Sequence, residues 1–294
     1  MCLVAFAIGE SHELPLLVAA NRDESYRRQT LGLSAWRLDN GVDVLAGRDL
    51  LAGGTWMGVG QNGRVALLTN IRPVDHSDKP AAAAAQSRGA LCSSWLGGMS
   101  WPAWLDSHSG HAFGGCNVVL GDLHQGTWHF ARNQASPAHA WHPSGWYTSE
   151  LTPGIYGLSN ADLDTPWPKL LQLKNAMALQ LQLKRHHSQA DGVTQAAHDL
   201  AMRNKLVEAL RDDTRLAQDP LSSVFVRWPQ ASYGTRSSTL MWVEQAAPRT
   251  VHMAEWRFDD NAQLLAQPKR LDMLTCAMPT SINGSPTAEK PNAL

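Results

Sequence analysis

The N-terminal segment is the part of the sequence that constrains the fold most. Residues 2–8 form an uninterrupted apolar run, and residues 14–20 form a second run after a short polar connection. Apolar runs of this length without alternation are typical of strands that are buried on both faces. The connection at residues 9–13 favours a hairpin, so we expect two paired central strands at the start of the chain.

The rest of the chain alternates blocks of strands with helices. Further strands are expected at residues 43–45, 55–59, 65–69, 117–121, 127–132, 157–159, 237–243 and 250–258. Asn62-Gly63 predicts a hairpin turn between the strands at 55–59 and 65–69, because both residues tolerate a positive φ. Helices are expected at residues 91–105, 167–183 and 194–211, with a loop at 73–88 and a polar connection at 184–193. Helices between blocks of antiparallel strands indicate an α+β fold in which helices pack on sheets. A four-layer α/β/β/α sandwich is one such arrangement, and periodicity alone also allows others.

Charge and length exclude several classes of protein. The 294 residues carry a formal net charge of -1, which argues against an extended basic surface for nucleic acid. Apolar runs stay shorter than about 18 residues, and the N-terminus lacks a basic segment, so we expect a cytoplasmic protein without a membrane span or signal peptide. One domain is expected over residues 1–276, followed by a disordered tail at 277–294.

The cysteines and histidines do not form a recognisable metal-binding pattern. The four cysteines are widely spaced, without a CxxC pair, and the twelve histidines show no HExxH pattern. We therefore expect reduced thiols and no metal site.

Cys2 is the candidate nucleophile. Removal of Met1 would leave Cys2 at the N-terminus, where one residue supplies both a thiol and an α-amine that titrates near neutrality. Such an amine can accept the thiol proton. The alternative interpretation is structural, because cysteine also serves as a small hydrophobic residue at the start of a buried strand.

Polar clusters stand at the ends of several apolar runs. They are Asn21-Arg22-Asp23-Glu24, Asn70-Ile71-Arg72, Asn117, Ser159-Asn160 and Tyr233-Gly234-Thr235-Arg236-Ser237-Ser238. Asparagine can donate to an oxyanion, aspartate can orient an amine, and arginine can hold a thiolate or a carboxylate. Each cluster also fits a turn or a surface ion pair, but their combination with Cys2 favours a functional site.

These motifs resemble the family named for its Asn-Arg-Asp-Glu sequence, whose eukaryotic members are called transport and Golgi organisation protein 2. The motif follows Met1-Cys2-Leu3-Val4 at a short distance, as residues 21–24. Further matching segments occur in family order at residues 53–59, 63–70, 115–122, 156–160, 165–169 and 233–239. Together they extend the resemblance over roughly residues 1–260.

The resemblance implies an α+β four-layer αββα sandwich of the N-terminal-nucleophile hydrolase type. The chain is similar, more distantly, to bile salt hydrolases and penicillin V acylases. By position, Cys2 matches their nucleophile, Asp23 the residue that orients its amine, Asn160 the oxyanion donor and Arg236 a late active-site arginine. Asn70 matches a polar residue at the end of an early strand.

One departure from the acylases, together with the family's association with haem trafficking, favours ligand binding over hydrolysis. In the acylases an arginine precedes the asparagine of the early motif. This chain has Ala20 at that position, and its arginine, Arg22, follows Asn21 instead. The leading hypothesis is binding and transfer of haem, or a similar hydrophobic anionic ligand, in a cleft centred on Cys2. The expected ligand-binding residues are Asn21, Arg22, Asn70, Arg72 and Asn117.

In this hypothesis the Cys2 thiolate or another side chain that lines the cleft ligates the haem iron, and Arg22, Arg72 or Arg236 pairs with the propionates. The resemblance also implies transient contact with a membrane. The rival hypothesis is a cysteine amidohydrolase that needs no cofactor and cleaves an acyl-amide or thioester. A third is an acyl-CoA, lipid-binding or interaction module on a degenerate hydrolase fold.

Overall fold

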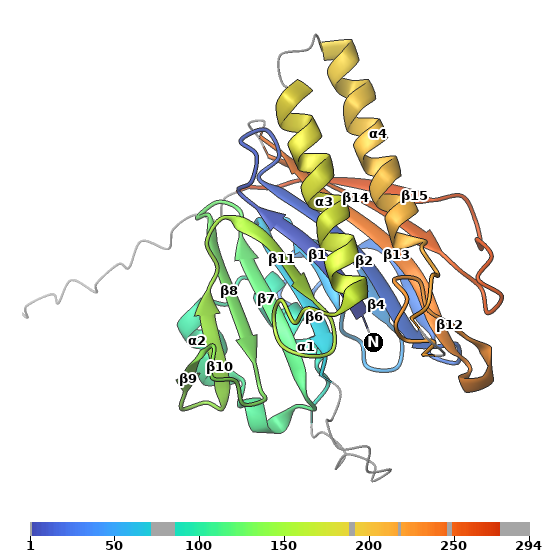
Figure 1. Cartoon of the computed structure of the whole chain (residues 1–294). Helices are drawn as coiled ribbons and strands as arrows, with labels where there is room; N and C mark the ends of the chain where they lie inside the picture. Colours follow the sequence, from blue (N-terminus) through green and yellow to red (C-terminus); the bar gives the residue numbers. More distant parts are fainter. Residues whose placement is uncertain (1, 72–85, 188–191, 217–218, 246–248, 277–294) are drawn as a thin grey trace, which may run out of the picture.

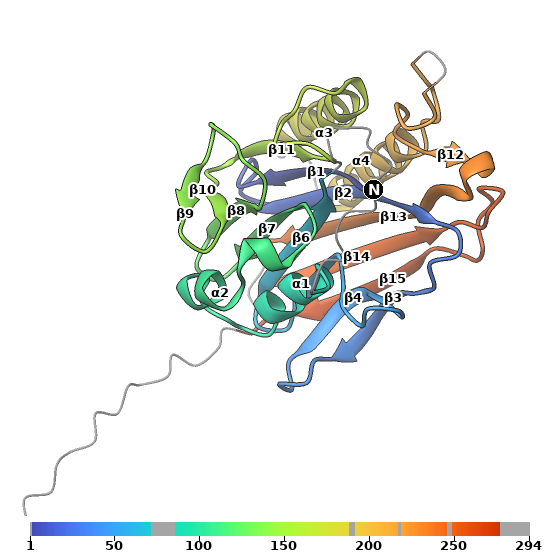
Figure 2. The same ribbon diagram turned by 90° about the horizontal axis from the view of Figure 1, so that it is seen from below.

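Two β-sheets stack face to face, and helices cover the outer face of each sheet (Figure 1, Figure 2). This computed structural model describes residues 2–71, 86–187, 192–216, 219–245 and 249–276. The four layers confirm the predicted α+β αββα sandwich. Arg72, the tail at 277–294 and most of the loop expected at 73–88 lie outside the described residues.

The first sheet is antiparallel and has the order β11-β1-β2-β13-β14-β15, with β12 paired to β13. Its strands are β1 Cys2–Ile8, β2 Leu16–Ser25, β11 Gly154–Leu158, β12 Arg227–Trp228, β13 Tyr233–Glu244, β14 Thr250–Arg257 and β15 Lys269–Leu274. The long helices α3 Pro168–His187 and α4 Gly192–Leu210 cover it. β1 and β2 are therefore buried on both faces, which explains their continuous apolar sequences.

The second sheet has the order β3-β4-β5-β6-β7-β8-β10-β9. Its strands are β3 Thr30–Arg37, β4 Asp43–Asp49, β5 Met57–Gly60, β6 Arg64–Asn70, β7 Cys116–Asp122, β8 Thr127–Arg132, β9 Ala140–His142 and β10 Trp146–Glu150. The short helices α1 Gly89–Leu96 and α2 Trp101–Ser107 cover it. β5 and β6 form the predicted hairpin, with Gly63 at a φ of 79° in the turn.

The core between the sheets shows which residues of β1 and β2 face inward. Val4, Phe6, Val18 and Ala20 pack in the cluster between the sheets, whereas their sequence neighbours pack against α3 and α4. Because strand side chains alternate between faces, even-numbered residues of both strands point between the sheets. Cys2 and Arg22 continue this inner series.

Several element boundaries differ from those expected. β2 continues through the Asn-Arg-Asp-Glu motif to Ser25, because the polar residues still pair with β1 and β13. The single helix expected at residues 91–105 is broken after Leu96, since Gly98 has a φ of 101° and Ser100 caps α2.

The strands β3 and β15 were not expected from the sequence. Both lie at or near a sheet edge and mix polar with apolar residues, which weakens their periodic signal. The helix α3 extends into the expected polar connection because Lys184 is only 7% exposed and its Nζ pairs with Asp199 Oδ1 of α4 at 2.7 Å.

Candidate functional site

A row of four directly opposed residues crosses the first sheet at the start of β1. Cys2 lies opposite Arg22, Arg22 lies opposite Ser237, and Ser237 lies opposite Arg257. Directly opposed residues of antiparallel strands share one face of the sheet. This face is the one between the two sheets, so the row presents a thiol, a hydroxyl and two guanidinium groups to the same space.

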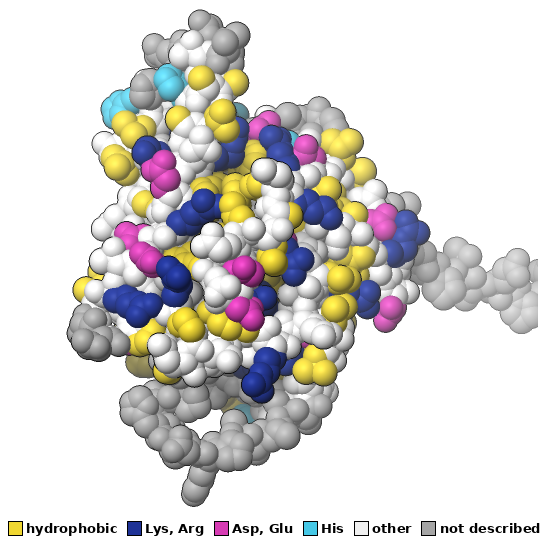
Figure 3. Space-filling model, turned by 90° about the vertical axis from the view of Figure 1, so that its right-hand side faces the viewer, with side chains coloured by type: hydrophobic (Ala, Val, Ile, Leu, Met, Phe, Trp, Pro, Cys, Tyr) yellow, Lys and Arg dark blue, Asp and Glu magenta, His cyan; other side chains and the backbone are white. Residues whose placement is uncertain are grey.

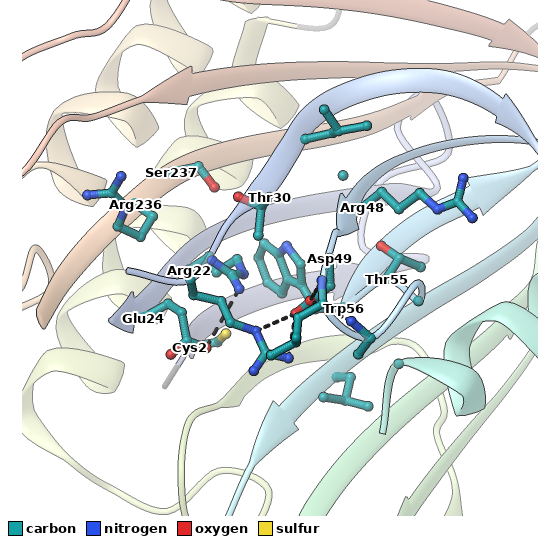
Figure 4. A pocket seen from close by; sticks show the side chains of 18 of the residues that line it. Cys2, Arg22, Glu24, Thr30, Arg48, Asp49, Thr55, Trp56, Arg236 and Ser237 are labelled. Carbon is teal, nitrogen blue, oxygen red and sulfur yellow. Dashed lines mark hydrogen bonds and ion pairs between the residues drawn. The ribbon is translucent and has the colours of Figure 1, made fainter. Parts of the chain in front are cut away.

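The row borders a cavity of about 380 Å³ between the two sheets (Figure 4). Among the described residues, six arginines and four carboxylates line it. The arginines are Arg22, Arg28, Arg48, Arg88, Arg236 and Arg257, and the carboxylates are Asp23, Glu24, Asp49 and Glu255. Trp56, Leu31 and Leu68 add apolar surface. An excess of arginine in a low-dielectric cleft favours an anionic ligand.

Arg22 has an unsatisfied donor in this cavity. The residue is 8% exposed, and its Nη1 is buried without a hydrogen-bond partner among the described residues. Its Nη2 lies 3.6 Å from Glu24 Oε2, which is an ion-pair distance rather than a short hydrogen bond. Buried polar groups in native proteins almost always have partners, so this donor is placed to receive an acceptor from a ligand.

Cys2 is buried at the same cavity. Burial raises the pKa of its thiol, and the neighbouring Arg22 guanidinium acts in the opposite direction. Ser159 Oγ donates to the Cys2 carbonyl at 3.0 Å and fixes the start of β1. Burial therefore favours the protonated form of the thiol.

Asp23 borders the cavity from the other face of β2. It is 1% exposed, and its Oδ1 accepts a hydrogen bond from Thr235 Oγ1 at 2.7 Å. Burial raises the pKa of this carboxyl, and the charge of Lys169 opposes the rise.

Arg236 reaches the cavity from an irregularity in β13. The register with β2 slips between Thr235 and Ser237, which leaves Arg236 as an extra residue. Such bulges redirect a side chain out of the regular alternation. Arg236 lines the cavity, lies 5.1 Å from the ring centroid of Tyr26 and pairs with Asp260 at 2.6 Å.

A hydrogen bond joins Asn160 to Asn70, which lines the cavity. Asn70 lines it, and its carbonyl accepts a hydrogen bond from Asn160 Nδ2 at 2.7 Å. Asn160 itself is 3% exposed and is not among the lining residues. Its amide therefore supports Asn70 in this structure.

Asn21 and Asn117 were expected to contact the ligand, but neither residue lines this cavity. Asn21 faces the helical layer, where its Nδ2 donates to the carbonyls of Leu210 and Val224 at 2.7 and 2.9 Å. Asn117 Nδ2 donates to the Ala161 carbonyl at 2.8 Å. Alternation along β2 separates Asn21 from Arg22, so one motif supplies both a structural and a cavity residue.

Sequence reasoning missed Glu255 and several arginines from distant segments. Glu255 is 8% exposed, and its Oε2 accepts the Leu33 backbone N–H at 2.7 Å. Burial raises the pKa of this carboxyl. The period-two series Val251, Met253, Glu255 could have indicated it, because the first two residues face the inter-sheet core.

Fold and site together define a class of protein: a four-layer α+β sandwich whose N-terminal strand begins with a thiol at an arginine-lined cavity. More particularly, the chain belongs to the Transport and Golgi organisation 2 family, whose model matches residues 1–260. Mouse Transport and Golgi organization 2 homolog is 30% identical over 266 residues, covering 83% of this chain and 89% of its own length. The bovine homolog is 30% identical over 297 residues and covers 94% and 98%.

Solved structures of hydrolases resemble the chain at low identity. A mutant conjugated bile acid hydrolase from Clostridium perfringens aligns with a TM-score of 0.49 and 9% identity, covering 93% of this chain and 92% of the hydrolase. A Caenorhabditis elegans N-acylethanolamine-hydrolyzing acid amidase ortholog aligns with a TM-score of 0.44 and 12% identity, covering 82% and 92%.

In the part of the chain that the structure describes, no helix combines the length and the apolar sequence that a membrane span requires.

Proposed function

We propose that this protein binds an anionic ligand with an apolar body in the Cys2 cavity and passes it to an acceptor, with haem as the leading cargo. The observation that carries the proposal is the buried, unpartnered Nη1 of Arg22 beside Cys2 in a cavity where arginines outnumber carboxylates. The names of the mouse and bovine relatives, which refer to transport, support a trafficking role. A cytoplasmic location and transient contact with a membrane belong to the same proposal.

The chemistry of haem matches the residues that line the cavity. Two propionates suit guanidinium groups, which bind carboxylates through paired donors. The apolar macrocycle suits Trp56 and Leu68. A cysteine thiolate is an established iron ligand, and coordination of Cys2 would release its thiol proton. The cavity volume of about 380 Å³ is of the size of small-molecule sites.

Paired titrations with haem and with metal-free protoporphyrin IX test this proposal. The wild-type protein is expected to give a saturable Soret band with haem, and Cys2→Ala is expected to shift that band. Protoporphyrin IX should bind both proteins equally, because it retains the propionates and lacks the iron. Cys276→Ala is the matched control, since Cys276 is an exposed cysteine that does not line the cavity. Titrations without saturation for either porphyrin would contradict the proposal.

A cysteine amidohydrolase is the second candidate, favoured by the buried Asp23 carboxyl at the cavity that holds Cys2. The α-amine of Cys2 would take the thiol proton while the sulfur attacks an acyl carbonyl; the C–N bond would then break, and the amine would leave with that proton. Water would then hydrolyse the thioester and restore the thiol.

Two mass measurements test the amidohydrolase. Intact mass of untagged protein should show loss of Met1, and an acyl electrophile should add to wild-type protein and not to Cys2→Ala. Retention of Met1 would remove the α-amine base and exclude this mechanism. Absence of both porphyrin binding and acyl adducts would favour an acyl-CoA, lipid-binding or interaction module.

A further inference from the structure

A further cavity lies at the end of the first sheet that is farthest from Cys2. It measures about 290 Å³ and lies between the β1–β2 connection, the end of β13 and the helices α3 and α4. Among the described residues, it shares none of its lining with the Cys2 cavity. The backbone N–H of Gln245 donates to the Glu13 carbonyl at 3.1 Å, which joins the connection to the end of β13. We call this space the α4 cavity, and its volume is close to the lower limit of small-molecule sites.

The helix α4 presents a row of polar side chains to this cavity. Gln195, Asp199 and Arg203 follow one another at intervals of four residues, which places them on one face of the helix. Asp199 Oδ1 accepts hydrogen bonds from Lys184 Nζ at 2.7 Å and from Gln195 Nε2 at 3.1 Å. Because a carboxylate only accepts, the amide nitrogen of Gln195 faces Asp199 and the amide oxygen is directed elsewhere.

The amide oxygen of Gln195 is an acceptor without a donor. This Oε1 atom is buried and has no hydrogen-bond partner among the described residues. Buried polar atoms in native proteins almost always have partners. Because Gln195 lines the cavity, a donor group of a ligand would complete the hydrogen bonds of this amide.

Arg203 supplies the opposite group, a donor without an acceptor. Within the described ranges of the chain its guanidinium forms no hydrogen bond or ion pair, and its central carbon lies 4.8 Å from the ring centroid of Trp242. An arginine stacked on an aromatic ring keeps its planar edge of donors available for a carboxylate. Lys184, the other cation of the cavity, is paired with Asp199 and lies 3.4 Å from Glu13 Oε2. Arg203 is therefore the cation that a ligand can reach.

The charges around Arg203 favour a ligand that carries both signs of charge. Asp199 and Glu244 act on Arg203 and oppose the lowering of its pKa by burial. A purely anionic ligand would meet these carboxylates, and a purely cationic ligand would leave Arg203 without an acceptor. Figure 3 shows basic and acidic side chains interspersed with hydrophobic ones on the side of the molecule that is at the right of Figure 1, so neither sign dominates that surface.

We propose that the α4 cavity binds a small amino acid with an apolar body. Its carboxylate pairs with the Arg203 guanidinium, its ammonium donates to Gln195 Oε1, and its hydrocarbon part packs on an apolar wall. The wall consists of Leu14, Met202 and Trp242, which are 5%, 4% and 2% exposed. This second ligand site is independent of the function proposed for the Cys2 cavity.

Calorimetric titration with 6-aminohexanoate and with L-leucine tests this site, because their charged groups are far apart and adjacent, respectively. Each probe is compared with one analogue that lacks the ammonium and one that lacks the carboxylate. These analogues are hexanoate and hexylamine for the first probe, and 4-methylpentanoate and 3-methylbutylamine for the second. At least one probe should bind saturably and about tenfold or more tightly than both of its analogues, since a charged hydrogen bond contributes that much.

Substitutions on α4 assign the two charged contacts. Arg203→Met should abolish the advantage of the bound probe over the analogue without the carboxylate, and Arg203→Lys should retain part of it, because the charge stays and the paired donors are lost. Gln195→Leu should reduce the advantage over the analogue without the ammonium. Lys205→Met is the matched control, because Lys205 also lies on α4, is 61% exposed and lines neither cavity. Far-UV circular dichroism checks that each variant is folded.

The outcomes separate this inference from the proposed function. Absence of saturable binding by both probes would overturn the amino-acid site, whether or not the Cys2 cavity binds a porphyrin. Equal affinity for a probe and its analogue without the ammonium would also overturn it. Binding that is lost in Arg22→Met and kept in Arg203→Met would place the probe in the Cys2 cavity and contradict the inference. Failure of protoporphyrin IX to bind, with probe binding intact, would overturn the proposed function alone.

Discussion

Cys2 and Arg22 lie directly opposite each other on β1 and β2 and point together into the space between the two sheets. This cross-strand pair joins the N-terminal thiol to the Asn-Arg-Asp-Glu motif. Because β13 and β14 continue the same row with Ser237 and Arg257, the site is built on four neighbouring strands of one sheet. Sites on sheet residues are held more rigidly than sites on loops.

Loss of the Arg22 guanidinium should weaken anion binding more than it affects stability. We expect Arg22→Met to lower affinity for protoporphyrin IX by about 10- to 100-fold, the effect of one charged hydrogen bond. The free energy of unfolding should stay equal or rise, because the substitution removes a buried donor without a partner. Fluorescence titration and urea unfolding measure the two effects. Arg37→Met is the control, since Arg37 is 67% exposed in a surface ion pair with Asp43. An equal loss of protoporphyrin IX affinity in both variants would contradict a specific role for Arg22.

Glu255 should give the protein a pH-dependent stability. Burial raises the folded-state pKa of this carboxyl above its unfolded value, so the folded state favours the protonated form. Its contribution to stability is fully present below the ordinary glutamate pKa and is lost as pH rises through the raised value. The unfolding free energy of Glu255→Gln minus that of wild type should therefore increase from about pH 4 to about pH 8. Denaturant unfolding across this range measures it, and a constant difference would show that the pKa is not raised.

Asp162 should show the opposite dependence. Hydrogen bonds from Arg132, Ser136 and His139 outweigh burial and lower its pKa to about 2. The stability it confers is present above the ordinary aspartate pKa and is lost as pH falls toward about 2.

We expect Asp162→Asn to lower the free energy of unfolding at neutral pH by about 1 to 2 kcal/mol, a value reduced for solvent screening of a side chain that is 27% exposed. The loss should shrink at about pH 3, where wild-type Asp162 begins to bind a proton. Urea unfolding at both pH values measures the change. Asp106→Asn, at an exposed position on α2, should change stability little at either pH.

Alkylation should distinguish the four cysteines. Near neutral pH, iodoacetamide should modify the exposed Cys276 first and Cys2 more slowly, because burial raises the pKa of the Cys2 thiol. Cys92 and Cys116 should react only after unfolding, since both are fully buried in the core under α1 and α2, and burial also raises their pKa values, that of Cys116 to about 12. Peptide mass spectrometry over time measures the order. Protoporphyrin IX should protect Cys2 and not Cys276, and equal protection of both would place the ligand elsewhere.

The sequence alone indicated much of the fold. Continuous apolar runs at the N-terminus predicted β1 and β2 as strands buried on both faces, and Asn62-Gly63 predicted the β5–β6 hairpin. These features are local, because they depend on side-chain periodicity and on backbone conformations that few residues adopt. Edge strands such as β3 carry a mixed pattern, and their pairing depends on partners far away in the sequence.

By itself, the sequence determined that Cys2 is the thiol of the site, that it stands at the start of a buried strand, and that the Asn-Arg-Asp-Glu motif at residues 21–24 belongs to the site. Tertiary structure decided which motif residues reach the cavity. Alternation along β2 sends Arg22 inward and Asn21 toward α4, and the bulge in β13 brings Arg236 to the same space. Glu255 and Arg257 reach the cavity only because β14 pairs with β13. The register of this pair is set by contacts between the two strands, which a local sequence pattern does not reveal.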